Sequence, residues 1–299
     1  MPRNPFSMTG RMAKPLPLGL GKSFYVVPSA DALEGEAKDY FRTDEDGNAR
    51  IYTSIADAIT DCVSGRGDYI YVMPGTYTLT TALAMSKNDV HLIGIGNNRA
   101  ILTGSGADVM DLTADGCEIA GFTFNLATTK KVIDMVGADR NWIHDNLFLS
   151  SVGGAASHFI HMVTTVCHYN RINGNRFLSN LVVSGGAITQ TSHITGLGIG
   201  NIIEDNFLMA GRVTTANAGV VTDGIVFAAA ADAGNIVRNN ILTEFNGATF
   251  GEGIDYGTTA LAGSVFTAGN NLMLATATDA IAPGTNAATF ANNIANGTV

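Results

Sequence analysis

The 299-residue chain has few cysteines and few charged residues. It has three cysteines, Cys62, Cys117 and Cys167, which lie far apart and form no CxxC pair. This number and spacing exclude a disulfide framework and a zinc knuckle, so buried thiols are expected. Only 14% of the residues are charged, whereas disordered chains combine high charge with few apolar residues. We therefore expect a folded domain.

Positive charge is also scarce. Seventeen Lys and Arg face 26 Asp and Glu, for a net charge of −9, so the basic footprint that phosphate binding requires is missing and no nucleic-acid partner is expected. No apolar run reaches the ~18 residues of a membrane-spanning helix, and no membrane partner is expected. The N-terminal residues lack the apolar core of a secretion signal, which argues against export by that route.

Proline is largely confined to one end of the chain. Residues 1–28 hold five of the seven prolines, and they carry basic residues but no acidic ones. Such a segment forms neither a long helix nor a central strand, so we predict an extended docking arm. Its expected partner-binding side chains are Arg3, Phe6, Arg11, Lys14 and Lys22.

Residues 29–66 are predicted to form an acidic linker that ends in a short helix. In TSIADAITDCV (53–63), Ile55, Ile59 and Val63 recur at four-residue intervals, which is typical of one helix face. Ser54 is a suitable N-cap, and Asp57 follows three residues later as in a capping box. Residues 67–299 form the remaining domain.

A repeat runs through that domain. The segments IHDNLF (143–148), INGNRF (172–177), IEDNFL (203–208) and VRNNIL (237–242) share an apolar residue, a Gly, Asp or Asn, then an Asn and another apolar residue. The recurring position starts at Phe122 and continues as Asn146, Asn175, Asn206, Asn240, Asn270 and Asn293. These positions are 23 to 34 residues apart, a period that indicates stacked structural repeats. Within each segment, apolar and polar residues alternate as in a strand.

These features predict an all-β fold: a right-handed, single-stranded parallel β-helix with an N-terminal capping helix and an extended N-terminal arm. Each strand would pair with its equivalent in the next coil, about 4.8 Å away. The Gly, Asp or Asn position suits a left-handed corner. The Asn that follows would stack on its equivalents in a hydrogen-bonded ladder. Phe122 would end that ladder at a terminal coil.

The segments DYIYVMPGTYTL (68–79) and NDVHLIGIGNNRAILTG (88–104) resemble the start of pectin-lyase-like β-helix proteins, and the resemblance extends over roughly residues 50–299. The superfamily includes polysaccharide lyases, glycoside hydrolases and virion proteins of tailed phages, and the chain looks most like the virion proteins. The resemblance implies that the helix caps the open end of the coil.

In this superfamily the substrate cleft follows the strand that we identify with a second series, MDL (110–112), IDM (133–135), IHM (160–162), ITQ (188–190), IVF (225–227), IDY (254–256) and IAP (281–283). Its outward position would present Asp111, Asp134 and His161 as a compact acid–acid–imidazole cluster, followed by Thr189. These three are the candidate catalytic residues if the chain is an enzyme. The alternative is that they are polar because the face meets water.

The catalytic signatures of the superfamily are missing. The motifs NTD, DD, GHG and RIK of its glycoside hydrolases do not occur, and no Arg or Lys stands in the outward series. No cofactor or metal is expected, since His158, His161 and His168 have no evident fourth ligand. Trp142 and Phe148 are expected in the core or wall, so no aromatic sugar platform is predicted.

From Gly257 to Val299 the only charged residue is Asp279, which favours a terminal stretch covered by other subunits. Together with the arm, this predicts a structural virion protein of a tailed phage, a capsid decoration or cement protein. We expect a homotrimer, assembled in the host cytoplasm and bound to the major capsid protein or another virion subunit through residues 1–28. The alternatives are a polysaccharide-degrading enzyme and a non-catalytic glycan- or receptor-binding tail protein.

Overall fold

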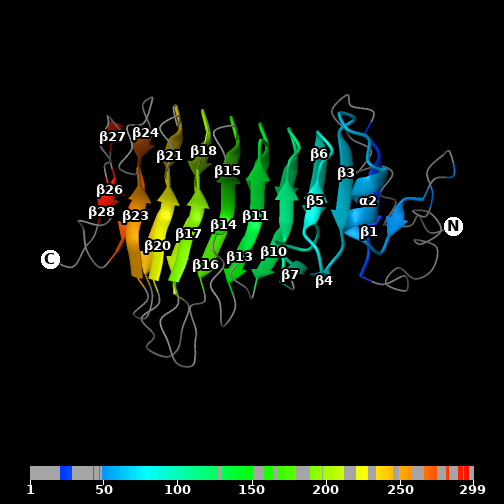
Figure 1. Ribbon diagram of the computed structural model, residues 1–299, viewed down its shortest axis with the longest axis horizontal. Helices are drawn as coiled ribbons and strands as arrows, with labels where there is room; N and C mark the ends of the chain where they lie inside the picture. Colours follow the sequence, from blue (N-terminus) through cyan, green and yellow to red (C-terminus); the bar gives the residue numbers. More distant parts are fainter. Residues whose placement is uncertain are drawn as a thin grey trace, which may run out of the picture.

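The chain winds into a long parallel β-helix (Figure 1). The computed structural model describes residues 21–28, 43, 47, 49–104, 106–126, 130–150, 158–163, 167–179, 189–196, 198–211, 220–227, 234–244, 249–256, 266–274, 281–282, 289–291 and 293–295. Within these residues, all paired strands run parallel. No helix of the described chain has the length and apolar character needed to cross a bilayer.

Each coil passes through three sheets in turn. The first sheet has eleven strands, in the order β2 (Ile51–Tyr52), β1 (Ser23–Val26), β3 (Asp68–Val72), β6 (Val90–Gly94), β9 (Glu118–Ala120), β12 (Trp142–His144), β15 (Arg171–Asn173), β18 (Ile202–Glu204), β21 (Ile236–Arg238), β24 (Phe266–Ala268) and β27 (Thr289–Ala291). The second has nine: β4 (Gly75–Leu79), β7 (Ala100–Gly104), β10 (Phe122–Leu126), β13 (Leu147–Ser150), β16 (Arg176–Ser179), β19 (Phe207–Ala210), β22 (Ile241–Glu244), β25 (Asn271–Met273) and β28 (Ile294–Ala295). The third has eight: β5 (Leu83–Met85), β8 (Met110–Leu112), β11 (Lys131–Val136), β14 (His158–Val163), β17 (Thr189–Thr195), β20 (Val220–Val226), β23 (Thr249–Asp255) and β26 (Ile281–Ala282).

The core consists of columns of like side chains that run along the coil. Alternate residues of each strand point inward, as in β3, where Asp68, Ile70 and Val72 are buried. In the second sheet the inward position is occupied in successive coils by Phe124, Phe148, Phe177, Leu208, Leu242 and Leu272, all fully buried. Stacked rings and aliphatic groups thus remove apolar surface from water in every coil, which is the main stabilising term.

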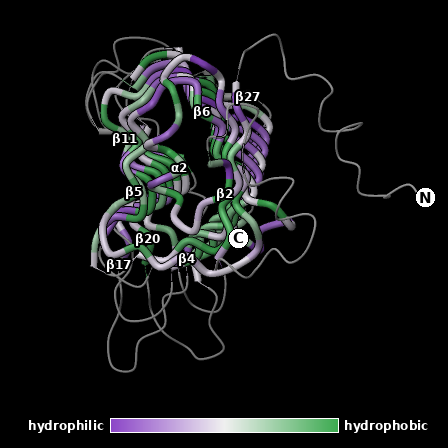
Figure 2. Tube along the Cα trace, turned by 90° about the vertical axis from the view of Figure 1, so that its right-hand side faces the viewer, coloured by the Kyte–Doolittle hydropathy of each residue, from purple (hydrophilic) through white to green (hydrophobic). Residues whose placement is uncertain are grey.

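The expected helix is present and covers the N-terminal end of this core. Helix α2 (Ile55–Asp61) begins after Ser54, whose Oγ accepts a hydrogen bond from the Asp57 amide. Ile55, Ala58 and Ile59 are buried against β1, β3 and β5. Figure 2, which looks along the coil, places α2 over the coil opening. A parallel coil leaves an exposed apolar end, and α2 shields it.

The expectation that residues 1–28 contain no central strand is wrong for Ser23–Val26. Strand β1 lies between β2 and β3 in the first sheet, and the backbone amide of Lys22 donates to Asp68 Oδ1 at 2.7 Å. The sequence allows this because residues 18–27 lack proline and SFYV is a strong strand former. Arg3, Phe6, Arg11 and Lys14 lie outside the described residues.

The predicted asparagine ladder is present. Each buried Asn from Asn146 to Asn270 donates two hydrogen bonds, from its backbone N–H and from its side-chain Nδ2, to the Oδ1 of the next Asn. The column ends at Asn293. Each Nδ2 also donates to a main-chain carbonyl of the preceding coil. The left-handed corners are those expected, namely Gly121, Asp145, Gly174, Asp205, Asn239 and Gly269. Phe122 starts the ladder, but not in a terminal coil, because β3–β5 and β6–β8 precede it.

A second asparagine ladder, which was not predicted from the sequence, is also present. Asn141, Asn170, Asn201 and Asn235 are buried, and each backbone amide donates to the next Oδ1 in the column. They precede β12, β15, β18 and β21, so asparagines flank both ends of these short strands. The signal was present: each copy of the repeat begins with Asn, as in NWIHDN (141–146) and NRINGN (170–175).

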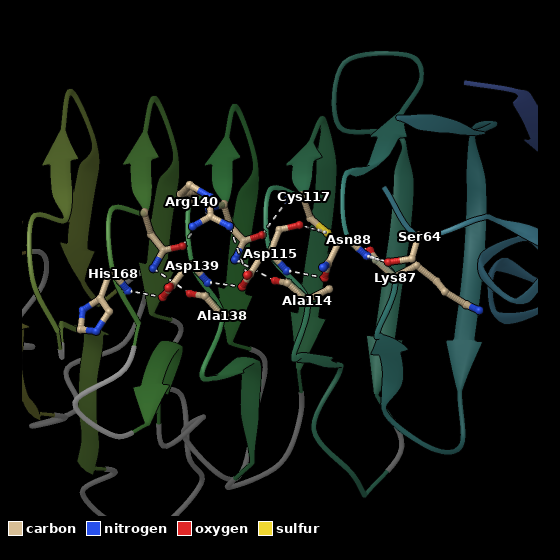
Figure 3. Close-up of polar contacts among 12 residues, drawn as sticks. Ser64, Lys87, Asn88, Ala114, Asp115, Cys117, Ala138, Asp139, Arg140 and His168 are labelled. Atoms are coloured by element: carbon tan, nitrogen blue, oxygen red, sulfur yellow. Dashed lines mark hydrogen bonds and ion pairs between the residues drawn. The ribbon is translucent and has the colours of Figure 1, made fainter. Parts of the chain in front are cut away.

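A third ladder runs beside the second and has the opposite sense (Figure 3). The side chains of Ser64, Asn88, Asp115, Asp139 and His168 each accept a hydrogen bond from a backbone amide of the following coil. The residues just after them, Gly65, Asp89, Gly116, Arg140 and Tyr169, take left-handed conformations. These corners are therefore fixed from both directions.

The register of the third sheet differs from the sequence prediction in one coil. His161 pairs with Thr195, whereas Thr189 pairs with Val220. The segment ITG (194–196) therefore replaces ITQ (188–190) in the series. Both segments begin with Ile-Thr, and the connections between the second and third sheets vary in length, so spacing alone did not separate them.

Candidate functional site

The outer face of the third sheet brings the three candidate residues together. Asp111, Asp134 and His161 occupy equivalent positions in β8, β11 and β14, as the register pairs show. All three side chains are half-buried. The carboxylates of Asp108, Asp111 and Asp134 each place an oxygen within 4.8 Å of the others. The sequence prediction of a compact acid–acid–imidazole cluster agrees with this geometry.

Asp134 orients two positively polarised groups. Its Oδ1 lies 2.8 Å from His161 Nδ1, and its Oδ2 accepts a hydrogen bond from Lys131 Nζ at 2.8 Å. The carboxylate contact places the proton of a neutral His161 ring on Nδ1. The unprotonated Nε2 is then the basic atom of the ring.

The pKa values of Asp111 and Asp134 are shifted in opposite directions. Burial alone would raise the pKa of Asp134, but hydrogen bonds from His161 and Lys131 outweigh it and lower that pKa. Burial raises the pKa of Asp111, and the charges of Asp108 and Asp134 raise it further. Neighbouring acids whose environments separate their pKa values in this way are suited to different roles in proton transfer.

Lys131 is a member of the cluster that the sequence reasoning missed. No Arg or Lys stands in the outward series itself. Lys131 lies three residues before Asp134 in the same strand, and its long side chain folds back onto the carboxylate. Its charge lowers the pKa of Asp134 and acts in the same direction on Asp111.

The imidazole of His158 extends the cluster. Its ring stacks on His161 with 4.4 Å between centroids, and its Nδ1 lies 2.7 Å from Ser192 Oγ and 3.1 Å from Thr195 Oγ1. Burial, followed by the charge of His161, lowers the pKa of His158 to about 4. His158 is therefore neutral near pH 7 and bonded to hydroxyl groups.

A second acidic cluster lies further along the same sheet. Asp223 of β20 and Glu252 and Asp255 of β23 bring carboxylate oxygens within 4.8 Å of one another. Burial and the charge of Asp255 raise the pKa of Asp223 to about 6. His161 and Lys131 both lower the pKa of Asp134, whereas no imidazole or ammonium group contributes to the raised pKa of Asp223.

The outer face of the first sheet carries a row of charged and aromatic side chains. Glu118 lies 2.7 Å from His91 Nδ1 and 2.9 Å from His144 Nε2, and these contacts lower its pKa to about 2. Glu204 accepts hydrogen bonds from both Arg238 and Arg171.

Trp142 belongs to this outer row and is 39% exposed. Its expected place in the core or wall is therefore wrong, because the Trp occupies the strand position that faces away from the core, next to the buried Ile143.

No known protein-family model and no curated protein sequence matches the chain. Solved structures resemble it in fold. An alginate lyase from a Paenibacillus species is 17% identical over 80% of this chain and 91% of that chain, with a TM-score of 0.51. The YbhC protein of Escherichia coli is 12% identical over 94% and 87%, with a TM-score of 0.53. A tailspike of an Escherichia coli bacteriophage, solved with a pentasaccharide, is 12% identical over 85% and 64%, with a TM-score of 0.40. The chain has the parallel β-helix fold of pectin-lyase-like proteins.

Proposed function

We propose that this β-helix binds a polysaccharide across the outer face of its third sheet and cleaves it there. His161 serves as the general base and Asp111 as the general acid. The observation that carries the proposal is the contact of Asp134 with both His161 Nδ1 and Lys131 Nζ, beside a second carboxylate with a raised pKa. An outward position that merely meets water does not require such an interlocked arrangement.

The chemistry follows from the positions of the protons. Asp134 holds the His161 ring so that Nε2 takes a proton, either from an attacking water or from a carbon next to a sugar carboxylate. Asp111 gives its proton to the glycosidic oxygen as that oxygen leaves. Both oxygens of Asp134 are engaged, so Asp134 positions His161 and does not act as the nucleophile. The ammonium of Lys131 offsets the charge of the Asp134 carboxylate.

The test measures cleavage of a panel of acidic and neutral polysaccharides by the full chain and by Asp134→Asn, His161→Ala and Asp255→Asn. Loss of the ring-orienting carboxylate is expected to lower the rate about 10²–10⁴-fold, as is usual for general-base catalysis. Asp255→Asn, in the other acidic cluster, should leave the rate within a few-fold. A wild-type protein that cleaves nothing, or an Asp134→Asn protein that cleaves normally, refutes the proposal.

The products distinguish the two reaction types. A hydrolase adds water across the broken bond and yields two saturated ends. A lyase removes a proton from carbon and leaves a double bond in the new non-reducing sugar, which absorbs ultraviolet light. Asp111→Asn should slow either reaction.

A structural role in a virion is the second candidate. It is favoured by the large apolar side chains exposed towards the C-terminal end, Ile241, Phe266 and Met273. In this role the coil would be a homotrimeric decoration or cement protein, attached through its N-terminal residues to a shell subunit. Sedimentation of the wild type and of Phe266→Arg checks it: the role requires a trimer that the substitution weakens. A wild-type monomer excludes the homotrimer.

A further inference from the structure

His158 and His161 lie three residues apart in strand β14, and yet their rings meet on the outer face of the third sheet. In regular alternation, residues three apart point to opposite faces of a sheet. In β14 the two residues between them, Phe159 and Ile160, are both fully buried, so the alternation is interrupted by one residue. Strand β11 has the same interruption at the equivalent positions. Interruptions of this kind re-aim a side chain, and this one turns His158 towards the candidate base.

Two hydroxyl groups of the following coil hold His158 in place. Its Nδ1 lies 2.7 Å from Ser192 Oγ and 3.1 Å from Thr195 Oγ1, and the two hydroxyl oxygens are 2.8 Å apart. The register explains this triangle, because Ser192 pairs with His158 and Thr195 pairs with His161. Both hydroxyl residues are buried. A buried polar network whose members satisfy one another is rigid, so the His158 ring has little freedom to turn.

The His161 ring is consequently held from two directions. His158 lies against one face of it, with 4.4 Å between the ring centroids and 27° between the ring planes. Asp134 Oδ1 holds its edge, at 2.8 Å from Nδ1. The face contact opposes rotation of the ring away from Asp134, so Nε2 keeps a fixed place. A general base is effective only when its accepting atom lies within hydrogen-bond reach of the proton that it removes.

His158 gives this support without adding charge. Burial, followed by the charges of His161 and Lys131, lowers the pKa of His158 to about 4, although the charge of Asp134 acts in the opposite direction. The ring that faces His161 is therefore neutral when His161 takes up a proton. A second imidazolium at this distance would repel that proton and make His161 a weaker base.

We propose that His158 is a positioning residue for the candidate base: packed between the hydroxyl groups of Ser192 and Thr195 and the ring of His161, it fixes the orientation of that ring against Asp134. His158 exchanges no proton with the substrate itself. This inference depends on the proposed function, because the orientation of His161 matters to a reaction only if its Nε2 accepts the proton. It assigns the support of the base to the flat face of the His158 ring.

A matched pair of substitutions separates the ring of His158 from its hydrogen bonds. His158→Phe keeps a flat ring for the stack and loses the nitrogen, while the Ser192 and Thr195 hydroxyls still bond each other. His158→Asn keeps a polar group towards the hydroxyls and loses the ring. Any difference between the two variants therefore reports on the stack.

Steady-state cleavage by the full chain gives the first measurement. In His158→Asn, kcat should fall about 10²-fold while KM stays within about twofold, because misplacement of a catalytic group by ~1 Å costs about that much in rate. His158→Phe should retain most of the wild-type kcat. His91→Ala, which changes a histidine on the first sheet, is the control and should leave kcat and KM unchanged.

Nuclear magnetic resonance gives a second measurement that does not require cleavage. The imidazole ¹⁵N shifts of His161 should show a single tautomer, protonated at Nδ1, in the wild type and in His158→Phe. In His158→Asn they should show exchange between both tautomers. If that variant does not fold, Ser192→Ala replaces it, and a smaller fall in kcat at constant KM is expected.

Equal kcat losses in His158→Phe and His158→Asn overturn the positioning role, because the stack would then have no effect. An unchanged kcat and a single His161 tautomer in His158→Asn, or in Ser192→Ala if that variant replaces it, also overturn it, even where Asp134→Asn abolishes cleavage and the proposed function stands. A wild type that cleaves nothing refutes the proposed function instead. A tautomer change in His158→Asn would still show that His158 orients His161.

Discussion

The Oδ1 atom of Asn206 accepts two hydrogen bonds from Asn175, one from its backbone amide at 3.0 Å and one from its Nδ2 at 3.2 Å. In turn, Asn206 Nδ2 donates to Ile172 O at 2.9 Å and to Asn240 Oδ1 at 3.0 Å. The carboxamide is fully buried, and its donors and acceptor are all used. Polar groups inside the wall thus cost little, because each satisfies the next.

Removal of one member should therefore destabilise the whole stack. Asn206→Ala removes the acceptor of the Asn175 backbone N–H and the Nδ2 donor to the Ile172 carbonyl, while Asn240 Oδ1 keeps its bond from the residue 206 backbone amide. At about 1–3 kcal/mol for the unsatisfied buried amide, with a further cost for the lost Nδ2 bonds, we expect a loss of a few kcal/mol in the free energy of unfolding. Denaturant titration checks this value. Thr222→Ala, on an exposed position of β20, is the control and should change stability by less than about 0.5 kcal/mol.

Alanine should destabilise the fold by different amounts at two of the corner glycines, Gly121 and Gly234. Gly121 has φ of 77°, and a Cβ there would lie 2.4 Å from Gly94 O, whereas Gly234 has φ of 64° and open space around that position. Gly234→Ala should cost only the left-handed strain, about 1–2 kcal/mol. Gly121→Ala must also force two coils apart, so its melting temperature should fall clearly further. Equal losses in the two variants would show that steric contact is unimportant.

Cleavage should depend on pH through Asp111. As the general acid, Asp111 must be protonated, and its pKa is raised by burial, Asp108 and Asp134. The rate should therefore fall as pH rises through that raised pKa. In Asp111→Asn the rate is lower, and this alkaline decline is absent. Initial rates across the pH range test it, and a decline that persists in the variant assigns the acid to another residue.

His193 should weaken the fold in acid. Its ring is fully buried beside Phe159 and Phe250, with Nε2 2.6 Å from Ser179 Oγ and no partner for Nδ1 among the residues that the structure describes. Burial lowers its pKa from 6.5 to about 3. Between these pH values the unfolded chain binds the extra proton, so this contribution to stability declines as pH falls, by about 1.4 kcal/mol per pH unit at most.

Comparison with His193→Gln measures this effect. The stability difference between wild type and variant should be constant above pH 7 and shift in favour of the variant as the solution is acidified. Parallel stability profiles of the two proteins would show that His193 does not titrate on unfolding.

The coil was predictable because its rules are local. The Asn period, the left-handed corners and the Ser54 cap each depend on a residue type at a fixed spacing. The predictions failed where residue spacing does not determine which strands pair. Thr189 was chosen over Thr195 because the preceding connection differs in length, and β1 was missed because the prolines around it dominated the composition of its segment.

The candidate site was predictable in its strand positions but not in its side-chain reach. Asp111, Asp134 and His161 follow from the register. Lys131 joins them only because a flexible chain folds back from a neighbouring position, and a pattern of alternate residues does not encode that.

The three ladders have a consequence for the evolution of length in this molecule. Where all three ladders run, each coil gives its successor the same kinds of donors and acceptors that it receives, as the contacts of Asn141, Asn146 and His168 show. A segment of one coil length is therefore an interchangeable module. Duplication of such a module lengthens the rod without creating a new kind of joint. Insertion of a single residue between Asn170 and Asn175 would instead displace both columns at once, so growth by whole windings is the route that the architecture favours.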